Sequence, residues 1–376
     1  MKKDGDEKIF KHYDKYNYEK KYNDVKTPLI AAIENRNKEI VEILLNQKNI
    51  DMNIKYESSY NFYVDGEYTQ NDGRESKSIL FLAAEKDYSE ILQILINKNI
   101  LDVNELNEIY GPIGPSYLYM FKKLTSLHIA VINENYDSIK VLLNSINIDI
   151  NCVELDRDFY GGIKEPTPLI IAIEKENSKI VQLLLSKSEI NLNYVCYYYH
   201  HQVPCEGDEY DEPISILTPL QLAVEKENKE IIQILLETKK IDINENGYKR
   251  SYANRGLLIN KSTKSALNMA IEKNNFDITQ MLLSYDGIDV NSFAIYFKRD
   301  NNILLLYEKT PLFIAIENEN IKIIELLLEN NKIKKNIELN ITKHIFGDKN
   351  HTYEKTNVLE LANKKGNASI INILKQ

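Results

Sequence analysis

Residues 167–193 read TPLIIAIEKENSKIVQLLLSKSEINLN, and this stretch decides the fold. Thr167 is suited to cap a helix, because its hydroxyl accepts an otherwise unpaired backbone N–H. Pro168 fits the first helical turn, since it has no N–H to leave unpaired. Leu169 and Ile173 share one helical face, and a second apolar stripe follows within the same stretch. The stretch therefore predicts two short antiparallel helices.

The same phrase returns along the whole chain, with a Thr-Pro-Leu-like opening and an Ile-Asp-x-Asn close. Internal repetition of this kind predicts one elongated domain whose units contact mainly their neighbours. We expect the array to span residues 27–376, and residues 1–26 to form a leader or a partial first hairpin. The eight units begin at Thr27, Ser78, Thr125, Thr167, Thr218, Ser265, Thr310 and Asn357.

Each predicted helix has about two turns, and isolated helices this short are marginal in water. One unit should therefore not fold alone, and stacking on the next unit must stabilise it. The second helix of each unit carries an apolar pair at a constant offset, which we expect in the core: Leu44-Leu45, Leu95-Ile96, Leu142-Leu143, Leu184-Leu185, Leu235-Leu236, Leu282-Leu283 and Leu327-Leu328.

The repeated phrase resembles the ankyrin repeat, whose Thr-Pro-Leu-His-x-Ala opening precedes a Val-x-x-Leu-Leu helix. Residues 125–130 keep the family's histidine, His128, which the family uses to link neighbouring units by hydrogen bonds. The resemblance implies a mainly α fold, an ankyrin-type helix-turn-helix solenoid of eight repeats with extended β-hairpin fingers. It also implies a protein that binds other proteins and has no catalytic chemistry. The bias toward Ile, Lys, Asn and Tyr is similar to divergent, long-finger ankyrin proteins of AT-rich protists.

The chain departs from the family between the two helices of a unit. Seven units lack the family's glycine there and have Arg36, Asp87, Glu134, Glu176, Glu227, Asn274 or Glu319 instead. An asparagine follows in most units, and Asn tolerates the left-handed conformation better than most residues. We therefore expect that asparagine, for example Asn37, to adopt the left-handed turn.

The units are 42 to 51 residues apart, and the extra length lies between the closing Asn and the next helix start. Residues 292–309 show the expected geometry best: apolar residues 293–297, a polar turn at 299–302 and apolar residues 303–307. We therefore predict a hairpin finger in each of the segments 54–77, 105–124, 152–166, 194–217, 245–264, 292–309 and 341–356.

Tyrosine is concentrated in these segments, which contain 18 of the 25 tyrosines. Tyrosine offers a large contact area at low rotamer cost, so it suits interaction surfaces. The alternative is that the rings pair across strands and only stabilise the hairpins. The candidate partner-binding residues are Tyr63, Tyr68, Tyr117, Tyr119, Tyr160, Tyr197, Tyr198, Tyr199, Tyr252 and Tyr296.

Charge differs between two adjacent segments: residues 194–217 carry acidic residues without Lys or Arg, whereas residues 245–264 are basic. Adjacent acidic and basic patches could orient a binding partner. The alternative is that these charged side chains pair with each other or remain solvated. The same acidic segment holds Cys196, His200, His201 and Cys205, with Cys152 one segment away. These residues could form a zinc-binding site or a Cys196–Cys205 disulfide. The spacing matches no common zinc module, so we favour the interpretation that they are loop residues without a metal or a disulfide.

The sequence contains no Gly-x-Ser-x-Gly elbow and no phosphate-binding loop, so we expect no enzyme and no cofactor. A net charge of −9 argues against nucleic-acid partners. Three cysteines point to a reducing compartment, and no signal peptide or transmembrane segment is predicted. We expect a cytoplasmic monomer.

These observations favour a protein-binding scaffold that uses its tyrosine-rich fingers and the concave face of the solenoid. One alternative is a structural adaptor that links cytoskeletal or membrane-associated proteins through its two ends. Another is a metal-dependent or regulatory module in residues 194–217.

Overall fold

The computed structural model describes residues 18–24, 26–64, 67–112, 119–153, 155–156, 162–164, 166–199, 215–252, 258–300, 303–345 and 351–375. Side chains are described for residues 26–59, 74–109, 122–153, 166–197, 215–249, 262–298, 303–343 and 352–375. Within these ranges the chain forms sixteen helices and fifteen strands. The expected description as mainly α is therefore too narrow, because β-hairpins alternate with the helix pairs throughout the described ranges.

The first helix of each pair begins directly after the Thr, Ser or Asn that opens the repeated phrase, as predicted. In all eight pairs that side chain accepts a hydrogen bond from the backbone N–H three residues later, with N···O distances of 3.0 to 3.4 Å. The first helices are α2 (Pro28–Glu34), α4 (Ile79–Glu85), α6 (Ser126–Ile132), α8 (Pro168–Glu174), α10 (Pro219–Glu225), α12 (Ala266–Glu272), α14 (Pro311–Glu317) and α16 (Val358–Lys365).

The second helix of most pairs begins after an asparagine. The side chains of Asn37, Asn228, Asn275, Asn320 and Asn367 each accept a hydrogen bond from the N–H three residues on. The second helices are α3 (Lys38–Leu45), α5 (Ser89–Asn97), α7 (Tyr136–Leu143), α9 (Ser178–Leu185), α11 (Lys229–Glu237), α13 (Phe276–Leu283), α15 (Ile321–Leu328) and α17 (Ala368–Lys375).

The prediction that this asparagine adopts the left-handed conformation is wrong. Asn37 has a φ of −90° and serves as the helix cap. The left-handed residue is the one before it, which replaces the family's glycine. Its φ lies between 52° and 58° in seven pairs, at Arg36, Asp87, Glu134, Glu176, Glu227, Asn274 and Glu319, and is 69° at Gly366.

Side-chain hydrogen bonds explain why non-glycine residues occupy several of these strained positions. Glu227 accepts a hydrogen bond of 3.0 Å from Asn275 in the next pair, and Asp87 accepts one of 2.8 Å from the Ser138 hydroxyl. Glycine would avoid the left-handed strain but would lose these contacts between neighbouring pairs.

The strands form antiparallel hairpins in six of the seven segments predicted for them, whereas the segment 152–166 contributes one strand to each of two different sheets. Residues 18–24 of the expected leader form a strand that pairs with β2. In the segment 292–309, Phe297 pairs with Leu306 and Tyr296 with Tyr307. The strands are β1 (Tyr18–Asp24), β2 (Lys55–Val64), β3 (Glu67–Ser78), β4 (Asn107–Pro112), β5 (Tyr119–Leu124), β6 (Leu155–Asp156), β7 (Gly162–Lys164), β8 (Cys196–Tyr199), β9 (Ser215–Leu217), β10 (Gly247–Tyr252), β11 (Leu258–Lys264), β12 (Ala294–Asp300), β13 (Ile303–Lys309), β14 (Leu339–Ile345) and β15 (His351–Thr356).

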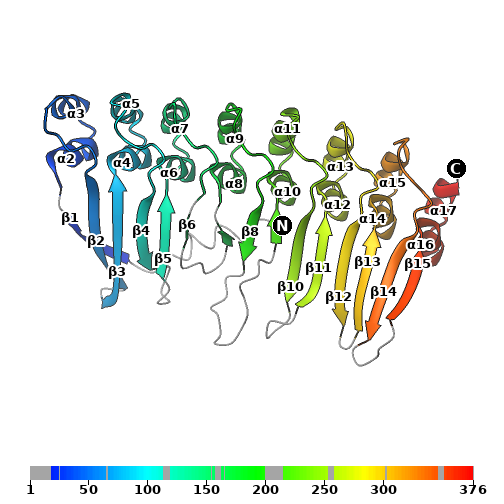
Figure 1. Ribbon diagram of the computed structural model, residues 1–376. Coiled ribbons are helices and arrows are strands. Elements are labelled where there is room, and N and C mark those ends of the chain that lie inside the picture. The colour runs from blue at the N-terminus through cyan, green and yellow to red at the C-terminus, as the bar shows by residue number, and fades with distance from the viewer. Residues whose placement is uncertain are drawn as a thin grey trace. The chain divides into compact units, whose positions relative to one another are not determined.

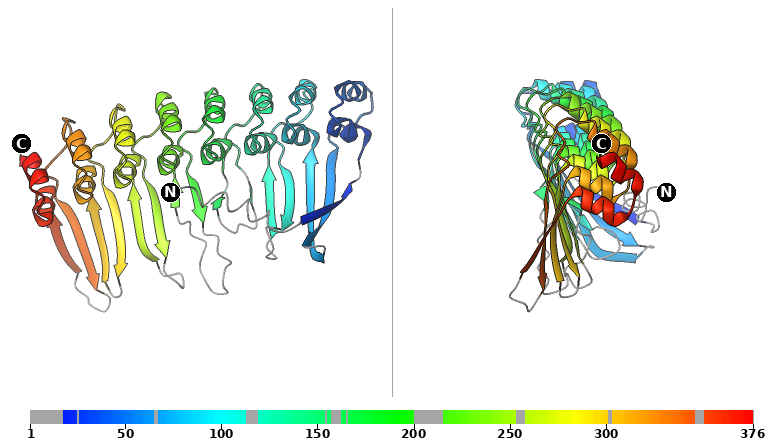
Figure 2. Two further views of the ribbon diagram at one scale, coloured as in Figure 1. Left: turned by 180° about the vertical axis from the view of Figure 1, so that it is seen from behind. Right: turned by 90° about the vertical axis from the view of Figure 1, so that its right-hand side faces the viewer.

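The chain divides into two compact units, Met1–Ala172 with Lys179–Ile190, and Ile173–Ser178 with Asn191–Gln376. Within each unit the helix pairs follow one another in chain order, and the hairpins extend from the first helices to one side (Figure 1). The view from behind shows the same arrangement within the second unit (Figure 2). Neighbouring hairpins also pair with each other, in the orders β1-β2-β3-β4-β5-β6 and β15-β14-β13-β12-β11-β10-β9-β8.

The core lies between neighbouring helix pairs. The leucine two residues after the opening cap is at most 2% exposed in seven pairs, whereas Leu359 in the last pair is 39% exposed. Of the predicted apolar pairs, the first member is fully buried from Leu95 to Leu327. Leu44 is half-buried, and so are the second members Ile96, Leu185, Leu283 and Leu328. Each fully buried leucine contributes about 1.5–3 kcal/mol to folding.

The histidine of the repeated phrase links two neighbouring pairs, as the family resemblance implied. His128 Nδ1 accepts from the Thr125 N–H at 3.3 Å, and its Nε2 lies 3.3 Å from the Pro166 carbonyl oxygen before the next pair. Burial lowers the pKa of His128 to about 4, and burial raises the pKa of the adjacent Cys152 thiol to about 11. Both groups are therefore neutral near pH 7.

Gln221 makes the same link two pairs further on. Its Oε1 accepts from the Thr218 N–H at 2.9 Å, and its Nε2 donates to the Lys264 carbonyl oxygen at 3.2 Å.

Among the described residues, no helix is both long and apolar enough to cross a membrane.

Candidate binding surface

The hairpin β12–β13 shows how the two faces of the second sheet differ. Side chains alternate between faces along a strand, so Tyr296 and Tyr307 lie on one face. Phe297 and Leu306 lie on the other. We call the first the network face. The second, with Ile295, Phe297, Leu306 and Tyr353, is called the open face.

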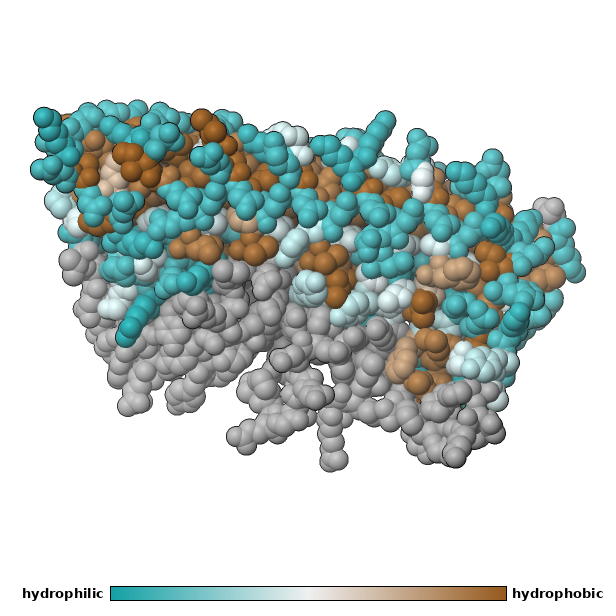
Figure 3. All heavy atoms as spheres, viewed as in Figure 1, coloured by the Kyte–Doolittle hydropathy of each residue, from teal (hydrophilic) through white to brown (hydrophobic). Residues whose placement is uncertain are grey.

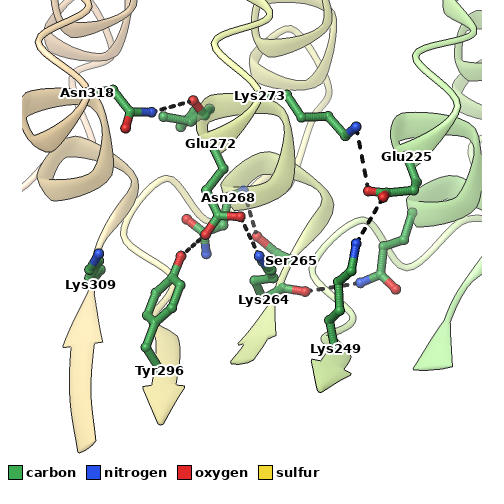
Figure 4. A network of polar contacts seen from close by, with 12 residues as sticks. Glu225, Lys249, Lys264, Ser265, Asn268, Glu272, Lys273, Tyr296, Lys309 and Asn318 are labelled. Atoms are coloured by element: carbon green, nitrogen blue, oxygen red, sulfur yellow. Dashed lines mark hydrogen bonds and ion pairs between the residues drawn. The ribbon is translucent and has the colours of Figure 1, made fainter. Parts of the chain in front are cut away.

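On the network face, Tyr296 is held by contacts within the protein. Its hydroxyl donates to Glu272, which also pairs with Lys264 (Figure 4). Its ring stacks on Tyr307 with a centroid distance of 5.4 Å and an interplanar angle of 9°. Lys309 Nζ lies 4.6 Å from the Tyr296 ring centroid, within the range of a cation–π contact. Tyr296 thus anchors the hairpin to helix α12.

Burial raises the pKa of Tyr296, and the negative charge of Glu272 raises it further. Burial also raises the pKa of Tyr307, with a smaller effect of Glu317. Both phenols therefore stay protonated at physiological pH, and Tyr296 remains a hydrogen-bond donor. These are properties of hairpin structure rather than of a reactive site.

An ion pair joins the residue before the cap to the end of the first helix in four pairs. The lysine just before the cap pairs with the glutamate that ends the first helix: Lys26–Glu34 at 2.9 Å, Lys77–Glu85 at 2.8 Å, Lys264–Glu272 and Lys309–Glu317. Pro166 and Leu217 replace this lysine in two other pairs. Their glutamates pair instead with lysines elsewhere: Glu174 with Lys226 at 2.7 Å and Glu225 with Lys249 at 3.2 Å.

Burial by itself would raise the pKa of Glu225. Lys249 and Lys273 outweigh that effect and hold the pKa of Glu225 below its ordinary value. Lys249 and Lys264, which belong to the predicted basic patch, are thus engaged within the protein. The acidic residues of the neighbouring patch, from Glu206 to Glu212, lie outside the described residues.

The open face exposes apolar and aromatic side chains. Ile295 is 42% exposed, Leu306 43% and Tyr353 75%. Strand register places Phe297, Leu306, Thr342 and Tyr353 in one line across β12 to β15. Figure 3 shows apolar residues exposed on the lower part of the second unit, next to hydrophilic ones. Clustered exposed apolar side chains commonly mark interaction sites.

The same face continues across β8 to β11. Strand register aligns Tyr197, Ile216, Tyr248, Thr263 and Ile295 in a second line. Tyr197, Ile216 and Tyr248 are half-buried. The open face therefore carries aromatic or aliphatic side chains from several consecutive hairpins of the second unit.

The structure places the ten candidate tyrosines as follows. Tyr296 belongs to the network face and Tyr197 to the open face. Tyr117 and Tyr160 lie outside the described residues. The backbone of the other six is in strands, but their side chains are not among those described: Tyr63, Tyr68, Tyr119, Tyr198, Tyr199 and Tyr252.

Of the metal candidates, Cys196 is fully buried, and its Sγ donates to the Leu217 carbonyl oxygen at 3.2 Å. His200, His201 and Cys205 lie outside the described residues. Within the part of the chain that the structure describes, no group of three or more His, Cys, Asp and Glu side chains is arranged to hold a metal ion.

Leu306 and Tyr353 were not among the residues predicted from the sequence. The tyrosine count favours segments with many tyrosines, whereas 341–356 has one. The signal that identifies these residues is alternation along each strand, combined with the register of neighbouring strands.

Comparison with known proteins gives three findings. A profile of three ankyrin repeats matches residues 56–154, 80–196, 127–247 and 195–294, and a single-repeat profile matches residues 26–56. The crystal structure of the ankyrin repeat protein EF0377 aligns with a TM-score of 0.41 and 18% identity, over 69% of this chain and 98% of that chain. A search of curated proteins gave no significant match.

Proposed function

Because this chain belongs to the ankyrin-repeat proteins, we propose that it is a non-enzymatic scaffold that binds partner proteins through the open face of its hairpin sheet. Ankyrin repeats generally mediate protein–protein interaction. We further propose that the eight helix pairs are eight repeats of the family and that the long hairpins are enlarged versions of its fingers.

The difference between the two faces of the hairpin sheet carries this proposal. On the network face, tyrosine, lysine and glutamate side chains bind one another. The hydroxyl of Tyr296 already donates its hydrogen bond to Glu272, so it is not available to a partner. On the open face, Ile295, Leu306 and Tyr353 direct much of their surface to solvent. Exposing apolar surface has an unfavourable free energy that a bound partner would remove.

The proposed mechanism is reversible recognition without a bond-making step. Rings such as Tyr353 and Tyr197 would act as anchors, because aromatic side chains contribute much of the binding energy at protein interfaces. We propose the remaining candidate tyrosines as contact residues of their own hairpins: Tyr63, Tyr68, Tyr117, Tyr119, Tyr160, Tyr198, Tyr199 and Tyr252. Tyr296 is excluded because it anchors its own hairpin.

The test uses the full chain as bait in a lysate of cells that express it, with captured proteins identified by mass spectrometry. The variant changes Ile295, Leu306 and Tyr353 to serine. We expect partners captured by the unchanged protein to be lost, with the melting temperature nearly unchanged because all three residues are exposed.

A control variant changes Ile43, Ile100 and Ile146 to serine. These residues are 61%, 65% and 95% exposed and belong to the first unit, not to the hairpins of the second unit. The control should retain the partners. Retention by both variants would show that recognition takes place elsewhere.

A further inference from the structure

A cavity of about 450 Å³ lies between the second helices α7 and α9 of the first unit. Its lining consists of Tyr136, Lys140, Lys179, Gln182, Leu183 and Ser186. We call this cavity the outer groove. It is formed by the second helices and not by the hairpins, so it is separate from the open face.

The repeated sequence provides an internal comparison for each lining position. Lys179 is the second residue of its helix, where five other pairs have an acid: Glu39, Glu90, Asp137, Glu230 and Asp277. Lys140 is the fifth residue of its helix, where every other pair has an acid or an amide: Glu42, Gln93, Gln182, Gln233, Gln280, Glu325 and Asn372. The outer groove thus has two lysines at positions where the repeat favours acidic or neutral residues.

Stability of the helix does not explain Lys179. The N-terminal end of a helix carries a partial positive charge, so acids in the first turn are favourable and lysines are not. Lys322 is also a second residue, but Glu325 follows it within one turn of α15. Gln182 stands at the corresponding place in α9 and offers no compensating charge.

Two other junctions between neighbouring second helices are joined by an ion pair at these positions. Lys38 of α3 pairs with Glu90 of α5 at 3.2 Å, and Lys229 of α11 pairs with Asp277 of α13. In the outer groove, Tyr136 replaces the first-position lysine and Lys179 replaces the second-position acid. Among the described residues no such pair joins α7 and α9, and a depression with two lysines and a tyrosine lies between them.

The two lysines differ in whether they already form an ion pair within the protein. Lys140 contacts Asp137 of its own helix at 3.3 Å, with both side chains more than half exposed. Such exposed pairs are weak and exchange readily with other partners. Lys179 makes no ion pair or hydrogen bond with any other described residue.

We propose that the outer groove binds an acidic segment of a partner protein. Its carboxylates would lie between Lys140 and Lys179, and an apolar side chain would contact Tyr136 and Leu183. The net charge of −9 repels acidic chains at long range, so attraction of an acidic segment has to come from these two lysines at short range. This proposal names a second surface and does not depend on the open face.

The test measures fluorescence anisotropy of a labelled peptide that has two glutamates on each side of a leucine, added to the full chain. A peptide with glutamines in place of the glutamates serves as the ligand control. We expect the acidic peptide to bind and the glutamine peptide not to bind. Changing Lys140 and Lys179 to glutamate should weaken binding of the acidic peptide, with a dissociation constant about tenfold higher or more.

The matched control changes Lys322 and Lys332 to glutamate, which gives the same total charge at positions outside the groove. It should change the affinity less than twofold, because salt screens exposed charges that do not contact the peptide. Equal weakening by both variants would show general charge attraction and overturn the proposal, as would no binding to the unchanged protein. The variant with serine at 295, 306 and 353 should bind the peptide normally, which keeps the two proposals separately testable.

Discussion

The side-chain oxygen of Asn104 accepts a hydrogen bond of 2.8 Å from the backbone N–H of Asp149, across the boundary between neighbouring helix pairs. Its Nδ2 also donates to the Asn147 carbonyl oxygen at 2.7 Å. Asn104 is the closing Asn of the repeated phrase. The equivalent Asn244 and Asn291 each make the same two kinds of contact with the following pair. The closing asparagine is therefore a clamp between neighbouring pairs.

We expect Asn104→Ala to lower the free energy of unfolding by about 1–2 kcal/mol, because two hydrogen bonds between pairs are lost. Urea titration followed by circular dichroism measures this change. Asn144→Ala is the control, since that exposed side chain makes no hydrogen bond with any other described residue. A similar loss in both variants would mean that the clamp contributes little.

Stability should fall in mild acid because of His128. Its folded pKa of about 4 lies below the ordinary value of about 6.5. Between these two values the unfolded chain binds more protons than the folded one, so stability rises with pH. We expect this group to lower the free energy of unfolding by about 2 kcal/mol between pH 7.5 and pH 5.

His128→Gln separates this effect from other acid effects. Gln221 shows that glutamine can link the cap N–H to the next pair at this position of the repeat. The variant should fold and should lose about 2 kcal/mol less than the unchanged protein over the same pH range. Parallel stability curves for the two proteins would rule out titration of His128 as the cause.

Glu176→Gly should raise the free energy of unfolding by up to about 1 kcal/mol. Glu176 has a φ of 55°, and glycine removes the left-handed strain while adding some entropy to the unfolded chain. Glu227→Gly relieves the same strain but gives up the hydrogen bond to Asn275. Its gain should be smaller, and an equal gain in thermal melts would show that this bond adds nothing.

Gly247→Ala should destabilise the protein by about 1–3 kcal/mol, as overpacking does in a close-packed site. A Cβ there would lie 2.5 Å from both Gln221 Oε1 and the Ile216 carbonyl oxygen. Gly287→Ala meets nothing within 4 Å but places alanine at a φ of 86°, which has a cost of about 1–2 kcal/mol. Chemical denaturation should report the larger loss for Gly247→Ala if packing, and not strain alone, governs that site.

The helix starts could be predicted from sequence because capping is local. Thr27 or Thr310, followed by Pro and an apolar stripe, determines where a helix begins without reference to the rest of the chain. The hairpin at 292–309 was predictable for the same reason, since alternation and a polar turn lie within one segment.

Features between pairs were not predictable from one unit. The sequence marked Asn37 as the left-handed residue, but Arg36 adopts that conformation and Asn37 caps the next helix. Asparagine suits both roles, and only the backbone path decides between them. Tyr296 and Tyr353 look alike in sequence, yet the nearby Glu272 engages one and the other is exposed. The outer groove could not be predicted either, because it depends on which helices lie next to each other.

Pairing between successive hairpins restricts how this chain can change during evolution. Arg74 of one hairpin is in register with Tyr110 of the next, and Leu306 with Thr342. A repeat protein held together only by helix stacking can gain or lose a unit wherever two similar surfaces meet. Here a deletion would also have to match hairpin length and strand register on both sides of the junction. The units are thus repeated in sequence but not freely interchangeable, and successful duplications should involve blocks of several adjacent units.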